Sequence, residues 1–122
     1  MKKNLILTGG IFHPFDETSK TLEEILNTLG YESEITLDIE EGIKNIHNFD
    51  LVTFNALRWR MLNHEKYIPY LDEWQFSLSS NAKKILDRYI KTGGSMIAFH
   101  TSSICFDDWD GWSKLLGGKW VW

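Results

Sequence analysis

Residues 93–103 read GGSMIAFHTSS and hold the most informative pattern in this chain. A glycine pair that ends a helix is followed by a short apolar strand and then by a tight turn of small polar residues. In α/β proteins such a turn often displays a nucleophile between two small residues. Here Ala98 and Ser102 occupy the small positions, and His100 stands at the apex. An imidazole can bind a metal, transfer a proton or hold a polar ligand, so the pattern predicts a hydrolase-like or amidotransferase-like scaffold whose usual nucleophile is replaced.

Upstream of this stretch, three further segments have the pattern of β-strands. Residues 4–8 and 49–54 are mostly apolar, as expected for strands in the middle of a parallel sheet. Residues 31–39 alternate apolar and polar side chains, as expected for a half-exposed strand. Helix-like segments separate all four strands, which predicts a mostly parallel sheet covered by helices on both faces. Right-handed crossovers then give a flavodoxin-like three-layer α/β sandwich with strand order 2-1-3-4.

The helix-like segments carry candidate start and stop signals. The first long helix is expected to end at Gly30, and Thr21 with Glu24 is a candidate capping box near its start. The helix before residue 93 has three candidate N-caps: Ser79, Ser80 and Asn81. In the last helix, Asp107 and Asp108 are expected to charge or cap the start.

Residues 55–80 connect the third strand to the next helix and are rich in aromatic side chains. This connection is longer than an ordinary strand-to-helix loop, so it predicts a lid, a binding loop or an oligomer contact. The whole chain, residues 1–122, is expected to form one domain.

Composition narrows the possible partners and the compartment. The net charge is −4 and the pI about 5.5, which argues against nucleic acid as a main partner because phosphate binding needs a basic surface. No apolar run approaches the ~20 residues of a membrane-spanning helix. The single cysteine, Cys105, excludes an intrachain disulfide and suits a reducing cytoplasm, and its apolar neighbours favour a buried structural thiol.

Ligands of open parallel sheets bind beyond the carboxyl ends of the strands, where three loops of this chain are expected to meet. The candidate site residues in these loops are Gly10, His13, Glu17, Asn55, Trp59, His100, Thr101 and Ser102. Alternatives remain for several of them: a plain turn at the glycines, an incidental loop histidine at position 13 and a satisfied core histidine at position 100. The hydroxyl of Ser102 or Ser103 could act as a nucleophile, although N-capping of the next helix explains these residues better.

A metal site is a further possibility at this sheet edge. His13 and His100 could ligate zinc or another divalent metal, with Glu17 as a candidate third ligand. The chain contains neither an HxH nor an HExxH spacing, so the motif signal for a metal is weak.

Four segments together resemble the trehalose-utilization (ThuA-like) family: GGIFHPFDET at 9–18, the strand and turn at 93–102, FDDW at 106–109 and LGG at 116–118. The resemblance runs over essentially the whole chain. That family is similar in fold to class I glutamine amidotransferases but lacks their cysteine nucleophile, which agrees with a histidine at position 100. The resemblance implies a role in the metabolism of trehalose and related disaccharides.

The chain also departs from that family. Family domains are considerably longer, and the motif that contains Gly117 and Gly118 usually leads to further histidines. Here the sequence stops at Trp120-Val121-Trp122. The resemblance therefore implies an N-terminal half-domain, incomplete at its C-terminus, that leaves a sheet edge and apolar surface uncovered. Such a half-domain is expected to associate with itself, as a homo-oligomer, or with a partner half.

Three functions follow as hypotheses. The first is a ThuA-like protein that binds or processes a sugar-derived small molecule, with His13 and His100 as catalytic groups and Trp59 as a stacking platform. The second is a metal-assisted hydrolase of another small molecule, in which a bound metal activates water. The third is a non-catalytic half-domain whose aromatic C-terminus is an interface.

Overall fold

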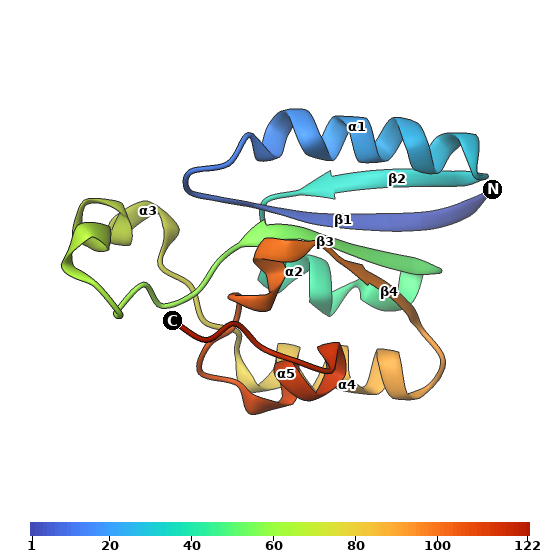
Figure 1. Cartoon of the computed structure of the whole chain (residues 1–122). Helices are drawn as coiled ribbons and strands as arrows, with labels where there is room; N and C mark the ends of the chain where they lie inside the picture. The colour runs from blue at the N-terminus through green and yellow to red at the C-terminus, as the bar shows by residue number, and fades with distance from the viewer.

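The computed structural model describes all residues, 1–122, and contains a four-stranded sheet with helices on both faces (Figure 1). The elements, with η marking 3-10 helices, are β1 (Lys2–Gly10), α1 (Phe15–Thr28), β2 (Tyr31–Thr36), α2 (Ile39–Lys44), η1 (Ile46–Asn48), β3 (Leu51–Leu57), η2 (Glu65–Tyr70), α3 (Leu71–Trp74), α4 (Ser80–Lys91), β4 (Ser95–Ala98), η3 (His100–Ser103) and α5 (Asp110–Leu116).

All strand pairs are parallel, and their order is β2-β1-β3-β4. This confirms the expected flavodoxin-like α/β sandwich and its strand order. Helix α1 covers one face of the sheet, whereas α2, α4 and α5 lie on the other (Figure 1). The carboxyl ends of β1, β3 and β4 therefore meet at one edge, as the crossover rule requires.

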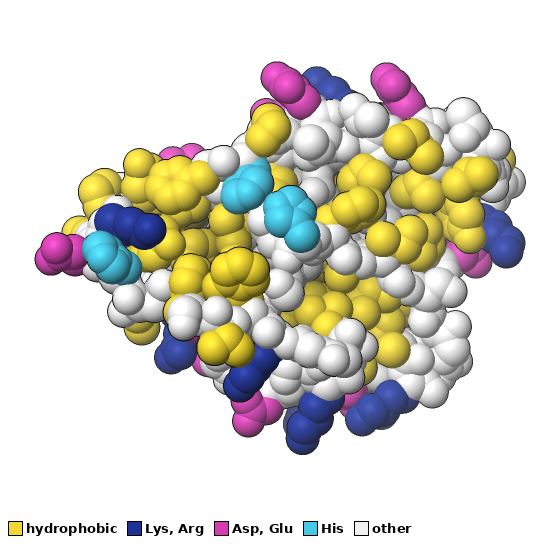
Figure 2. Space-filling view, in the orientation of Figure 1, with side chains coloured by type: hydrophobic (Ala, Val, Ile, Leu, Met, Phe, Trp, Pro, Cys, Tyr) yellow, Lys and Arg dark blue, Asp and Glu magenta, His cyan; other side chains and the backbone are white.

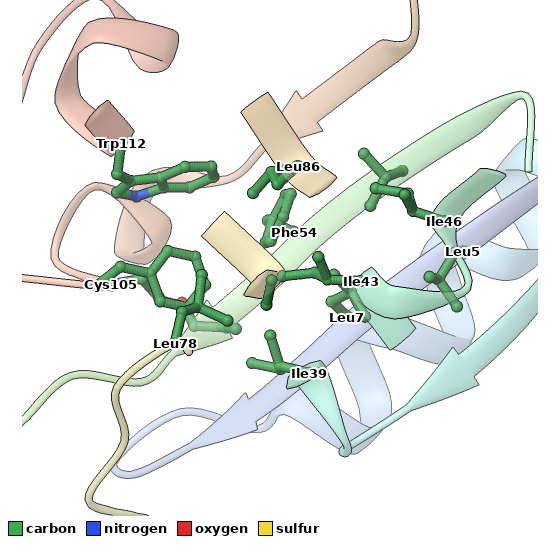
Figure 3. Close-up of a cluster of buried hydrophobic side chains, with 14 residues drawn as sticks. Leu5, Leu7, Ile39, Ile43, Ile46, Phe54, Leu78, Leu86, Cys105 and Trp112 are labelled. Carbon is green, nitrogen blue, oxygen red and sulfur yellow. The ribbon is translucent and has the colours of Figure 1, made fainter. Parts of the chain in front are cut away.

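The main core fills the space between the sheet and the layer of α2, α4 and α5 (Figure 3). Alternate residues of β1 and β3 point into it because side chains of a strand alternate between faces. These residues are Leu5, Leu7, Val52, Phe54 and Ala56. Trp112 of α5 lies against Phe54, with 4.8 Å between ring centroids, and anchors the last helix on this face.

The structure corrects the expected start of α1 and selects one of the three N-cap candidates of α4. Helix α1 begins at Phe15 instead of near Thr21, and the Thr21 hydroxyl donates to the Glu17 carbonyl, so the expected capping box is wrong. For α4 the N-cap is Ser79, whose hydroxyl accepts a hydrogen bond from the Ala82 amide.

The expected cap of α5 is also wrong. This helix begins at Asp110, and its N-cap Trp109 makes no side-chain hydrogen bond. Asp107 instead accepts two hydrogen bonds from Arg60, and Asp108 accepts one from the Ser77 hydroxyl. Both carboxylates thus fasten the long connection after β3 to the chain that follows η3.

The long connection between β3 and α4 contains η2 and α3 and lies beyond the carboxyl ends of the strands (Figure 1). Trp59, Met61 and Tyr67 form a second buried cluster with Ile11 and Phe15 of the first loop and helix. Arg58 lies between the rings of Trp74 and Phe76, 5.3 and 4.8 Å from their centroids. This connection is therefore a packed part of the domain.

Strand β4 forms one edge of the sheet, and no helix covers its α1-side face. Ile97 and Phe99 remain 39% and 36% exposed there.

None of the helices is long and apolar enough to pass through a membrane.

Candidate functional site

Two histidines from distant parts of the sequence lie next to one another at the carboxyl edge of the sheet. His13 comes from the loop between β1 and α1, and His100 begins η3 after β4. Their ring centroids are 5.6 Å apart, with 58° between the ring planes. Figure 2 shows two neighbouring histidine side chains on the exposed surface, with hydrophobic side chains around them. Both side chains are exposed, so neither is a satisfied core histidine.

The backbone before His13 is held in an unusual conformation. Gly10 has φ +138°, and a Cβ there would lie 2.4 Å from the Leu57 carbonyl oxygen, so only glycine allows this approach to β3. Phe12 has φ 66°, in the left-handed region that non-glycine residues seldom occupy. These two positions turn the chain so that the His13 ring faces η3.

A backbone contact also orients the His13 ring and selects its tautomer. The Nδ1 atom lies 3.1 Å from the Ile11 carbonyl oxygen, which can only accept a hydrogen bond. The neutral ring therefore carries its proton on Nδ1 and leaves the lone pair of Nε2 free. His13 can accept a proton or a hydroxyl hydrogen bond through Nε2.

The small polar residues after β4 fix the position of His100. The Thr101 hydroxyl donates to the Ala56 carbonyl at 2.7 Å, and the Ser102 hydroxyl donates to the Phe54 carbonyl at 3.0 Å. Both carbonyls belong to β3, so η3 is fastened to the neighbouring strand. The indole N–H of Trp112 donates to the Ser102 carbonyl at 2.8 Å and fixes the turn from the α5 side. These residues place His100 on a rigid support.

The two histidines line an open hollow of about 690 Å³. Its other lining residues are Leu57, Ala98, Phe99, Thr101, Ser103, Ile104, Leu116, Gly117, Gly118 and Trp120. None of these carries a formal charge at neutral pH. A site of this size and composition suits a small molecule with both apolar and hydroxyl groups, because apolar walls with a few polar contacts are typical of small-molecule sites.

Only some of the site residues predicted from the sequence line the hollow. His13, His100 and Thr101 line the hollow, whereas five other candidates lie outside its lining: Gly10, Glu17, Asn55, Trp59 and Ser102.

Two of these outlying residues, Trp59 and Asn55, have structural contacts that explain them. The Trp59 ring is 2% exposed and its N–H donates to Asn63, so it offers no free face on which a sugar could stack. Asn55 donates to the hydroxyls of Thr18 and Ser19 beneath α1.

The residues present do not complete a metal site. Nowhere in residues 1–122 do three or more His, Cys, Asp or Glu side chains converge in a way that could hold a metal ion. Protein zinc sites use at least three protein ligands, and His13 with His100 supplies two. Glu17 does not line the hollow.

Cys105 lies close to the site but outside its chemistry. The thiol is buried, and burial raises its pKa to about 12. Its sulfur accepts a hydrogen bond from the Arg58 amide at 3.3 Å and donates one to the Ala56 carbonyl. The side chain is a structural thiol, as its apolar neighbours predicted.

Sequence reasoning missed Trp120 as a wall of the hollow. This ring is 52% exposed, and the Trp120 amide donates to the Ser103 carbonyl at 3.4 Å, so the tail folds back onto η3. No local sequence motif predicts that the C-terminal tail folds back onto η3. The concentration of tryptophans near the C-terminus was the available signal, and it indicated only an aromatic surface.

The fold and site define a flavodoxin-like α/β protein with two histidines at the carboxyl edge of its sheet. A crystal structure of a ThuA-like protein from Bacteroides uniformis has this fold, with a TM-score of 0.65 and 18% sequence identity. The match covers 96% of this chain and 44% of that one, so the chain spans less than half the length of its structural neighbour. The sequence matches no known family model and no curated protein. At this identity the similarity shows a ThuA-like fold.

Proposed function

We propose that this chain binds a sugar-derived small molecule, of the trehalose-type disaccharide class, in the hollow at the carboxyl edge of the sheet. The observation that carries this proposal is the pairing of His13 with His100, 5.6 Å between centroids, at the rim of an uncharged hollow. The ThuA-like fold and the resemblance of the sequence to the trehalose-utilization family support the sugar class.

The lining offers the two kinds of contact that a sugar needs. Trp120 and Phe99 present aromatic surface on which the C–H face of a pyranose ring can pack, and Trp120 takes the role first expected of Trp59. The imidazoles and the Ser103 hydroxyl supply hydrogen bonds to sugar hydroxyls. The absence of formally charged lining residues favours a neutral ligand over a phosphorylated one.

If the ligand reacts, the histidines are the groups placed to move a proton. With Nδ1 engaged by the Ile11 carbonyl, Nε2 of His13 accepts a proton from a ligand hydroxyl. The ring of His100, beside it, makes no hydrogen bond within the chain and is free to contact the same ligand. Cysteine chemistry is not part of this proposal because the only thiol is buried with a raised pKa.

The test is calorimetric titration of trehalose and of an oxidised trehalose derivative into wild type, His100→Ala and His13→Ala. We expect each variant to weaken binding about tenfold, because the hydrogen bond between the imidazole and a sugar hydroxyl is lost. His64→Ala removes an exposed histidine outside the hollow and serves as the control. Equal binding by wild type and His100→Ala would overturn the proposal.

A non-catalytic role as a self-associating half-domain is the second candidate, and the exposed tail favours it. Trp120, Val121 and Trp122 are 52%, 77% and 65% exposed. Trp122 does not line the hollow, so Trp122→Ala separates association from ligand binding. On this alternative, sizing with light scattering shows an oligomer that Trp122→Ala dissociates.

We also propose that the protein is cytoplasmic. This proposal rests on its single cysteine, which is free and suits a reducing compartment.

A further inference from the structure

A second depression is lined by residues from the end of α2, from η1 and from one side of α4. Helices α2 and α4 belong to the layer that covers the apolar face of the sheet (Figure 1). It encloses about 470 Å³. Four of its lining side chains are basic or can become so: Lys44, His47, Lys84 and Arg88. No aspartate or glutamate lines it, although acidic residues outnumber lysine and arginine in the whole chain, 17 against 13.

The spacing of residues on α4 explains how the basic groups gather. The α4 side of the depression is formed by Asn81, Lys84, Ile85, Arg88, Tyr89 and Thr92. These positions recur every three or four residues, so they share one face of the helix. Ile46 lies opposite, at the start of η1, which packs against α4. The lining therefore combines the apolar side chains of Ile46 and Ile85 with cationic groups from both α2 and α4.

Ion pairing distinguishes this face from the rest of the helix. Lys91 lies outside the depression and pairs with Asp87 at 3.0 Å, one turn before it. Lys84 and Arg88 stand in the same i,i+4 relation, form no ion pair and repel one another. Lys44 has a partial partner in Glu40 at 3.5 Å. An anion between α2 and α4 would relieve this repulsion.

Helix capping explains only part of the pattern. Basic residues in a last turn interact favourably with the helix dipole, which accounts for Arg88 and Lys91 of α4. Lys84 lies in the second turn of the helix, beyond the reach of the dipole at either end, so capping does not account for its position.

We propose that this basic depression is a binding site for a small, multiply charged phosphate compound. Its volume falls within the range of small-molecule sites. Lys84 and Lys44 supply point charges from opposite sides, and the Arg88 guanidinium can bind phosphate oxygens through two parallel N–H groups. The site is separate from the histidine hollow and shares no lining residue with it.

The probe is inorganic pyrophosphate, titrated at constant ionic strength with the backbone amides followed by NMR. We expect saturable shifts confined to residues 44–47 and 81–92, with a dissociation constant below about 1 mM. Lys84→Gln with Arg88→Gln should weaken binding at least about tenfold, since each removes a charge-assisted contact. The matched control, Lys114→Gln with Lys119→Gln, removes the same charge from residues outside the depression and should bind as wild type does.

Two results would overturn the proposal. One is the absence of saturable shifts at about 10 mM pyrophosphate, which would leave only a solvated basic face. The other is equal weakening in both double variants, which would mean that net charge, and not this site, attracts the anion. All four substituted side chains are at the surface, and melting curves check that each variant is folded.

Discussion

The two faces of the same sheet are built in opposite ways. Toward α2, α4 and α5 the strands present Leu5, Leu7, Val52, Phe54 and Ala56, which pack into a continuous apolar core. Toward α1 the same two central strands present buried polar groups as well, among them Asn4, Thr8, Thr53 and Asn55. The chain thus uses apolar packing on one face and hydrogen bonding on much of the other.

The polar face is a satisfied network. The Thr53 hydroxyl donates to the Asn4 side-chain oxygen at 2.8 Å, and the Asn4 amide donates to the Ser33 hydroxyl at 3.0 Å. The Ser19 hydroxyl donates to Thr8 at 2.8 Å and ties α1 to β1. No buried side-chain nitrogen or oxygen lacks a partner. Apolar packing tolerates small shifts between neighbours, whereas each of these hydrogen bonds requires a set geometry. The network therefore fixes how β1, β2, β3 and α1 lie relative to one another.

The largest loss of stability is expected from opening the apolar face. Phe54 is fully buried between Phe106 and Trp112, so Phe54→Ala leaves a cavity that the surrounding rings cannot fill. We expect a loss of about 3–5 kcal/mol in the free energy of unfolding, measured in urea. Ile97→Ala on the other face, at a side chain already 39% exposed, is the control and should cost far less. Similar losses for both variants would contradict the contrast between the faces.

The reactivity of the single thiol, Cys105, tests whether water reaches the apolar face. Burial raises the pKa of Cys105 to about 12 from its ordinary 9.0, so the neutral thiol is favoured in the folded protein. At pH 8.5 we expect iodoacetamide to react at least about 100-fold more slowly with native than with urea-unfolded protein, because the thiolate is the nucleophile and burial raises the pKa of the thiol. Thr21→Cys in a Cys105→Ser background places a thiol at an exposed position of α1 and should react quickly in both states. Rapid modification of native Cys105 would show that water reaches this face.

On the polar face the expected loss is smaller and depends on which partner remains. Asn4→Leu leaves the Thr53 and Ser33 hydroxyls without their partner and should cost about 1–3 kcal/mol. Adding Thr53→Val removes one stranded hydroxyl, so the double variant should lose less than the sum of the two single losses. A double-mutant cycle by urea unfolding measures this coupling. Strict additivity would mean that the two side chains act independently.

Periodicity was sufficient to predict a parallel α/β sandwich, because strands and helices alternate along the chain. The observed strand order, β2-β1-β3-β4, is the flavodoxin-like one expected from the sequence. The same topology predicted that the loops of His13 and His100 would approach one another, and their rings do so. It could not predict the direction of Trp59, because a tryptophan has the same composition signal whether its ring points into a cluster or toward a ligand.

Polar contacts between residues far apart in the sequence could not be predicted from local sequence patterns, for a different reason. Asp107 looks like a helix start in sequence, yet it pairs with Arg60, 47 residues earlier. A carboxylate gains a similar free energy from a helix N-terminus and from an exposed guanidinium. The tertiary structure therefore decides which of the two it contacts. The position of Trp120 at the histidine hollow likewise depends on a contact with a residue distant in sequence, because its amide donates to the Ser103 carbonyl.

The smallest expected effect concerns the surface rim of the apolar face, where Glu40 of α2 accepts hydrogen bonds from the amide and hydroxyl of Ser79 at the start of α4. Partial burial alone would raise the pKa of Glu40, but the Ser79 hydrogen bonds and the charge of Lys44 outweigh it and leave the pKa below the ordinary 4.5. A lowered folded pKa stabilises the protein above the unfolded pKa, and this contribution is lost as pH falls through the folded value.

Glu40→Gln should therefore destabilise by about 0.5–1.5 kcal/mol at pH 7, because the carboxamide cannot accept both hydrogen bonds. The difference from wild type should shrink below pH 4.5 as the wild-type carboxylate becomes protonated. Urea unfolding of both proteins at pH 7, 4 and 3 measures it. Glu41→Gln, one position along the same helix, is the matched control, since the Glu41 carboxylate forms no hydrogen bond or ion pair with α4 and should show a smaller pH-dependent difference. A Glu40→Gln loss that stays constant across these pH values would mean that packing of the side chain, and not its charge, joins α2 to α4 at the edge of the apolar face.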